Sequence, residues 1–123
     1  MKTAASPIVL AALLGFASAC SEAPVEETPS GSVDAASLYR SQQCALCHGS
    51  EGQGMNGVGP DLRGMEALWT VDELMSYLAD PKGYTAKDER LSKNQGKYRM
   101  PMPQNNLDDT RRRALAEYVL ALD

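Results

Sequence analysis

The five residues Cys44-Ala45-Leu46-Cys47-His48 decide how the rest of the chain is interpreted. Two cysteines separated by two residues and followed directly by a histidine form the attachment signature of c-type haem. Each thiol can add to one vinyl group of the porphyrin, and this spacing lets both thiols reach along one edge of the ring. The sequence therefore predicts one covalent haem c, with thioether bonds at Cys44 and Cys47 and with His48 as the proximal axial ligand.

The same cysteine spacing also occurs in redox dithiols, in zinc sites and in disulfides. A zinc site needs about four ligands, and beyond Cys44, Cys47 and His48 the chain contains only one more cysteine, Cys20, and no second histidine. A thioredoxin-like dithiol belongs to a βαβ unit, and no strand pattern is visible here. Haem attachment is the favoured interpretation.

Composition bounds the size of the core and excludes one class of partner. The 123 residues suffice for one small domain, and only seven of them are aromatic. Such a core is marginal by itself, so a buried porphyrin would add the apolar area that it needs. The formal net charge of −4 argues against nucleic-acid binding.

Residues 1–19 have the three parts of a signal peptide: a positive start at Lys2, an apolar run over residues 8–16 and small residues before position 20. The run is too short to span a bilayer. Cys20 follows directly, as in a bacterial lipoprotein, which predicts lipidation of Cys20 and attachment to a membrane in the periplasm. The alternative is ordinary cleavage that leaves a thiol. The rest of residues 20–33, with two prolines and three glutamates, is expected to be a disordered linker.

Residues 34–123 are expected to form one all-α domain. Aspartates stand at N-cap positions before a first helix over residues 34–43 and a last helix over residues 108–122. Between them, Thr70 and Glu73 have the spacing of a capping box at the start of a helix that runs to about residue 79.

The segment between the first two of these helices holds candidate contacts to the haem. Residues 49–60 contain five glycines and form either a flexible loop or a tight one that approaches the ring. The carbonyl of Pro60 is placed to accept the Nδ1 proton of His48. A buried Trp69 would need a partner for its N–H, for which a haem propionate is a candidate, and Arg63 is a second candidate residue of the haem environment.

Two further segments have a possible role at the haem or at its surface. Met100-Pro101-Met102-Pro103 offers two thioether sulfurs, which are soft ligands suited to iron in electron-transfer haems. Because His48 is the only histidine, a second histidine ligand from the same molecule is impossible. Residues 82–99 are rich in lysine and arginine. They are either a solvated loop with a short helix or a positive patch that steers docking with an acidic partner.

Together these residues resemble the class I cytochromes c, and in particular the small bacterial members with one haem. The resemblance covers residues 34–123 and rests on five features: Tyr39 five residues before the first cysteine, the Cys-x-x-Cys-His motif, Gly59-Pro60-Asp61-Leu62, the Met-Pro loop, and a last helix that ends in Tyr118-Val119-Leu120. The resemblance implies a helical fold in which the first and last helices cross and the haem lies in a crevice. The Met-Pro loop resembles that of the small bacterial members, and this resemblance implies Met102 as the distal axial ligand. Met100 is the alternative.

The resemblance implies a one-electron carrier rather than an enzyme. Ligation by histidine and methionine raises the reduction potential, which suits a path between a quinol-oxidising complex and a terminal oxidase or reductase. One alternative is the haem subunit of a larger dehydrogenase. Another is a haem enzyme or sensor with an open sixth position, against which the Met-Pro loop argues.

Overall fold

The computed structural model describes residues 32–123. The predicted signal peptide, the predicted lipidation site at Cys20 and nearly all of the predicted linker lie outside the described residues. No helix within residues 32–123 is both long and apolar enough to cross a membrane.

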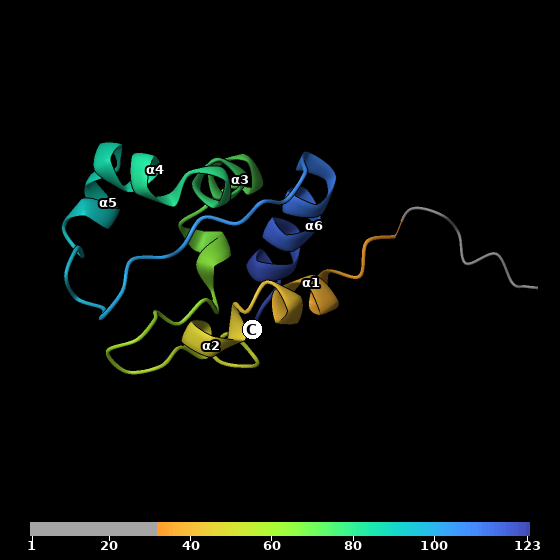
Figure 1. The fold of residues 1–123 in the computed structure, drawn as a ribbon, viewed down its shortest axis with the longest axis horizontal. Coiled ribbons are helices and arrows are strands. Elements are labelled where there is room, and N and C mark those ends of the chain that lie inside the picture. Colours follow the sequence, from red (N-terminus) through yellow and green to blue (C-terminus); the bar gives the residue numbers. More distant parts are fainter. Residues whose placement is uncertain (1–31) are drawn as a thin grey trace, which may run out of the picture. The chain divides into compact units, whose positions relative to one another are not determined.

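The described part of the chain is helical, as predicted, and contains no β-strand between residues 32 and 123 (Figure 1). Its elements are the α-helices α1 (Ala35–Ser41), α2 (Ala45–His48), α3 (Val71–Ala79), α4 (Pro81–Lys87), α5 (Glu89–Ser92) and α6 (Asp109–Leu120), and the 3-10 helix η1 (Met65–Ala67).

The three predicted helix starts are present. The side chain of Asp34 accepts a hydrogen bond from the backbone N–H of Ser37, and Asp108 caps α6 in the same way. At the start of α3, Thr70 and Glu73 form the predicted capping box, with each side chain bonded to the backbone of the other residue. These caps satisfy N–H groups that have no partner inside their own helix.

Helix α1 ends two residues earlier than predicted, and the reason bears on the functional site. Gln43 adopts the left-handed conformation with a φ of 61°, which stops the helix. The N–H of Cys44 donates to the carbonyl of Tyr39, and the N–H of Gln43 donates to that of Arg40. This pair of bonds is a Schellman motif, normally built on glycine. It turns the chain so that α2 begins directly after Cys44.

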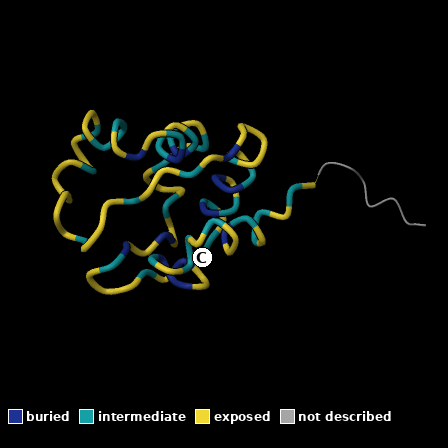
Figure 2. The backbone as a smooth tube through the Cα atoms, viewed as in Figure 1, coloured by how far each residue is buried: buried dark blue, intermediate teal, exposed yellow. Residues whose placement is uncertain are grey.

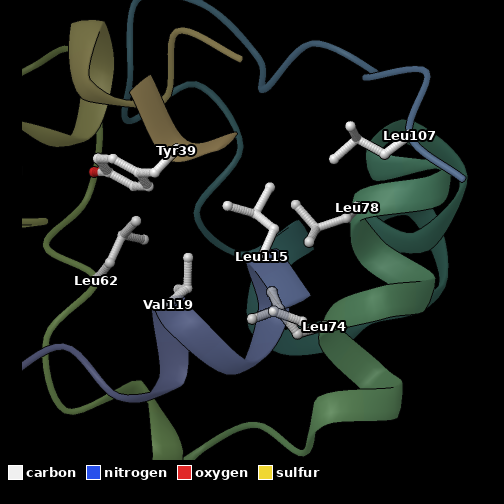
Figure 3. Packing of buried hydrophobic residues seen from close by; sticks show 8 residues of the cluster. Tyr39, Leu62, Leu74, Leu78, Leu107, Leu115 and Val119 are labelled. Carbon is white, nitrogen blue, oxygen red and sulfur yellow. The ribbon is translucent and has the colours of Figure 1, made fainter. Parts of the chain in front are cut away.

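The core lies where α6 packs against both α1 and α3 (Figure 3). Leu115 of α6 is completely buried and points between Tyr39 of α1 and Leu78 of α3. The predicted packing of the first helix on the last is confirmed, with the rings of Tyr39 and Tyr118 5.6 Å apart. The remaining buried hydrophobic residues are Leu62, Leu74, Leu107, Ala116 and Val119.

The expectation of a loop with one short helix over residues 82–99 is wrong, because two short helices occur there. Pro81 ends α3 but is also the first residue of α4, a position where proline's missing N–H costs nothing. Asp80 caps α4 through the N–H of Gly83, and Asp88 caps α5 through the N–H of Arg90.

Candidate haem site

The Cys-x-x-Cys-His segment forms one short helix, α2, with Cys44 at its N-cap and His48 as its last residue. Cys44 and Cys47 are free thiols, each half-buried, and are not joined by a disulfide. Burial raises the pKa of the Cys44 thiol, so this group lacks the acidity of a redox-active cysteine. Within residues 32–123, no cluster of three or more His, Cys, Asp and Glu side chains is arranged to bind a metal ion directly. These features favour haem attachment over a dithiol or zinc site.

The imidazole of His48 is buried and held in one orientation. Its Nδ1 lies 2.9 Å from the carbonyl oxygen of Pro60, which is the contact predicted from the sequence. Since a carbonyl only accepts, Nδ1 carries the proton and the lone pair is on Nε2, the atom left for a metal. Burial lowers the pKa of His48, although the bond to Pro60 opposes this effect. The ring is therefore neutral, and its Nε2 lone pair is available to a metal.

The glycine-rich segment after His48 packs tightly against α2, which decides between the two interpretations of this loop. The N–H of Gly54 donates to the carbonyl of His48 at 2.7 Å. Gly59 lies so close to Cys47 that a Cβ at Gly59 would be 2.4 Å from the Cys47 carbonyl oxygen. The backbone of the loop therefore lies against Cys47, and the carbonyl of Pro60 contacts the ring of His48.

Tyr39 adds a second fixed contact that the sequence analysis did not anticipate. Its hydroxyl donates a 2.8 Å hydrogen bond to the carbonyl of Gly49, the residue after His48. Tyr39 is only 1% exposed. Helix α1 thus holds the end of α2 that presents the imidazole.

The residues present fit a covalent haem. Two unlinked thiols stand three residues apart, and a buried neutral imidazole follows with Nε2 free of the bond that fixes Nδ1. The family model described as Cytochrome c matches residues 32–123.

The chain belongs to the cytochrome c family. It is a class I c-type cytochrome with the predicted all-α fold, and its cofactor is covalently attached haem c. Among curated proteins and among solved structures, no significant match to the chain was found. Cytochromes of this family are typically electron-transfer proteins, and the match supports a haem-based electron carrier.

Arg63 and Trp69, both predicted to lie in the haem environment of this cytochrome, each contact other protein side chains. Arg63 is exposed, and its guanidinium donates to the carboxylate of Asp61, with Nη2 and Oδ2 2.6 Å apart. This bonding lowers the pKa of Asp61 to about 2. Trp69 is half-buried and packs in an aromatic cluster with Tyr77 and Tyr84, whose ring centroids lie 5.4 Å and 5.7 Å from its own.

Arg90, rather than Arg63, is the arginine that contacts Trp69, and sequence analysis missed it. The Arg90 guanidinium carbon lies 4.9 Å from the centre of the indole ring, a cation–π distance. The same guanidinium donates to Asp88 and to the carbonyl of Leu68. The contact spans α5 and the segment before α3, so no local sequence pattern signals it. The roles of Arg63 and Trp69 toward the haem stay predictions.

The two methionines of the Met-Pro loop differ in burial. Met100 is 68% exposed, whereas Met102 is partly buried and packs against the hydrophobic core. The cytochrome thus holds one of the two candidate sulfurs against the protein interior and leaves the other in solvent.

Proposed function

We propose that this cytochrome c is a one-electron carrier of the periplasm whose haem iron is ligated by His48 and Met102. The observation that carries the proposal is the packing of Met102 on the core beside an exposed Met100. A side chain that is already ordered against the interior loses less conformational freedom when it binds iron than one free in solvent.

Each residue then has a defined part in electron transfer. The haem supplies an iron that changes oxidation state by one electron. Cys44 and Cys47 hold the cofactor permanently, and the carbonyl of Pro60 keeps Nε2 of His48 aimed in one direction. Met102 would hold the iron through a soft thioether, which would raise the reduction potential and keep other ligands out. An iron held by both His48 and Met102 would offer no site for a substrate, so the protein would transfer electrons without substrate chemistry.

The ligand assignment is tested by comparing Met102→Ala with Met100→Ala. We expect Met102→Ala to abolish the weak red absorbance band of a ferric methionine–iron bond and to lower the reduction potential. Met100→Ala should leave both unchanged, because that side chain is exposed. Loss of the band in Met100→Ala alone would move the assignment to Met100. A band that survives in the double variant would exclude both methionines.

The proposed location rests on the sequence before the described domain. If residues 1–19 export the chain and Cys20 is lipidated, the protein will fractionate with membranes. Cys20→Ser will then release it in soluble, haem-containing form. Wild-type protein found wholly in the soluble periplasmic fraction would contradict the anchor but not the electron-transfer role.

The proposed redox partner is an acidic protein that meets part of the basic segment. Within residues 32–123, Arg90 and Lys93 are paired with acidic side chains, which removes them from the patch. The basic residues of this segment that form no ion pair there are Lys82, Lys87, Lys97 and Arg99. Electron transfer to such a partner should slow as ionic strength rises, and Lys97→Gln should weaken that salt dependence. A rate independent of salt would contradict electrostatic docking.

A further inference from the structure

Residues 100–107, which we name the Met102 loop, connect the basic segment to α6 without forming any helix (Figure 1). Within the described chain, no backbone-to-backbone hydrogen bond involves these eight residues. Two of them are prolines, which lack an N–H. Most of the loop is exposed (Figure 2). Leu107, at its end, is buried. The position of the loop must therefore be set by side chains.

Arg112 of α6 holds the end of the loop. Its Nη2 donates to the carbonyl of Leu107, and its Nη1 donates to the carboxylate of Asp109 at 2.6 Å. The Arg112 side chain is only 16% exposed, and its bond to the Leu107 carbonyl is partly buried, whereas the Asp109 side chain is 88% exposed. A shielded charged donor on a backbone carbonyl is stronger than the same bond in solvent.

Gln104 holds the middle of the loop. Its Nε2 donates a 2.9 Å hydrogen bond to the carbonyl of Ala79, the last residue of α3. Carbonyls at a helix end have no partner within the helix, so this one is available to a side chain. The bond joins residues 25 positions apart in sequence and lies two residues after Met102.

The Met102 loop and α6 also contain buried polar atoms that lack a hydrogen-bond partner within the described residues. Among the residues that the structure describes, two buried side-chain polar atoms have no partner, Oδ1 of Asn105 and Nε of Arg112. One is an acceptor in the loop and the other is a donor on the helix that holds it. Buried groups of this kind are nearly always satisfied by a protein group or by a bound water.

We propose that Arg112 and Gln104 are positioning residues that hold the Met102 loop between α6 and α3, and thereby keep the Met102 sulfur at the sixth position. The proposal rests on the proposed function, since it takes Met102 as the ligand. Neither residue touches the reacting iron. Their effect is on the balance between the loop with methionine bound and the loop with methionine released.

The test is a titration of ferric holoprotein with imidazole, which competes with methionine for the iron. If a variant shifts the equilibrium toward the loop with methionine released, the apparent affinity for imidazole rises by the same factor as that equilibrium constant. For the loss of these hydrogen bonds we expect increases of about tenfold in Arg112→Gln and about fivefold in Gln104→Ala. The matched control is Arg113→Gln. Arg113 lies on the same helix and is 51% exposed, and within residues 32–123 its side chain bonds only to Asp72, so the imidazole affinity should equal that of the wild type.

The double variants separate positioning of Met102 from general loosening of the fold. In a Met102→Ala background, adding Arg112→Gln or Gln104→Ala should leave imidazole affinity unchanged, because no methionine remains to be positioned. A further increase in that background would overturn the proposal. If Arg112→Gln does not fold, the proposal is still tested by Gln104→Ala in the wild-type and Met102→Ala backgrounds, because Gln104 is exposed.

The outcome for Met102→Ala alone separates this proposal from the proposed function. If Met102→Ala binds imidazole no more tightly than the wild type, Met102 is not the ligand and both proposals fail. If Met102→Ala binds more tightly while Arg112→Gln and Gln104→Ala match the wild type, the ligand assignment stands and the positioning role is overturned.

Discussion

The hydroxyl of Tyr39 in α1 donates a 2.8 Å hydrogen bond to the carbonyl of Gly49, the residue that follows His48. Tyr39 is also a core residue, because its ring packs against Leu62, Leu115 and Val119 (Figure 3). One side chain therefore joins the hydrophobic core to the segment that presents His48. The fold and the ligand geometry are connected through this contact.

Replacing Tyr39 by phenylalanine should lower the free energy of unfolding by about 1–2 kcal/mol. The ring still fills its place in the core, but the buried carbonyl of Gly49 loses its partner. Denaturant unfolding followed by circular dichroism measures the difference. Tyr118→Phe is the control, since within the described chain the Tyr118 hydroxyl forms no hydrogen bond. Equal losses in the two variants would contradict a specific role for the Tyr39 hydroxyl.

The buried phenol also predicts a loss of stability at alkaline pH. Burial raises the pKa of Tyr39 to about 12, from the model-peptide value of 10.0. The folded state thus favours the neutral phenol, so its contribution is complete below pH 10 and is lost as the pH rises toward about 12. Over this window we expect the wild type to lose roughly 2 kcal/mol more than Tyr39→Phe. Unfolding free energies measured at stepwise pH for both proteins test this, and parallel curves would refute it.

Replacing Gly59 by alanine should impair both folding and haem attachment. The new Cβ would collide with the carbonyl group of Cys47. Backbone atoms cannot rotate away from such a contact as the end of a flexible side chain can. We expect a loss of about 1–3 kcal/mol and a smaller fraction of chains carrying covalent haem, measured by mass after denaturation. Gly57→Ala is the matched control, because it has open space around it and costs only about 1 kcal/mol for its left-handed backbone. The prediction fails if the two variants have equal haem content.

Replacing Thr70 by alanine should remove the capping box of α3 and cost about 1 kcal/mol. Both the bond from the Glu73 N–H to the Thr70 hydroxyl and the bond from that hydroxyl to the Glu73 carboxylate would be lost. Thermal unfolding of the holoprotein detects the change. Thr70→Ser keeps an oxygen at the same place and should restore most of the stability. Ser76→Ala, at an exposed position within α3, should have little effect.

The features that the sequence predicted correctly are short-range in the chain. Asp34, Thr70 and Asp108 each bond to a backbone N–H three residues away, so the residue types and spacing specify the contact. The Cys-x-x-Cys-His motif predicted covalent haem for the same reason, because attachment needs two thiols at a fixed spacing.

Local patterns were misleading where a residue takes a conformation or a position that its type does not usually indicate. Gln43 takes the left-handed conformation usually signalled by glycine, so the true end of α1 was missed. Pro81 ends one helix and starts the next, which hid α4 within a segment that looked like a loop.

The sequence by itself determined the cofactor and the helical class of this cytochrome c, because the haem-attachment motif and the helix caps each depend on residues a few positions apart in the chain. Tertiary structure alone decided that Arg90 rather than Arg63 lies on Trp69, and that Met102 packs inward while Met100 does not. These contacts join segments that come together only when α1, α3 and α6 have packed. A partner chosen by packing leaves no period or spacing in the sequence, because its position depends on the whole core rather than on its neighbours in the chain.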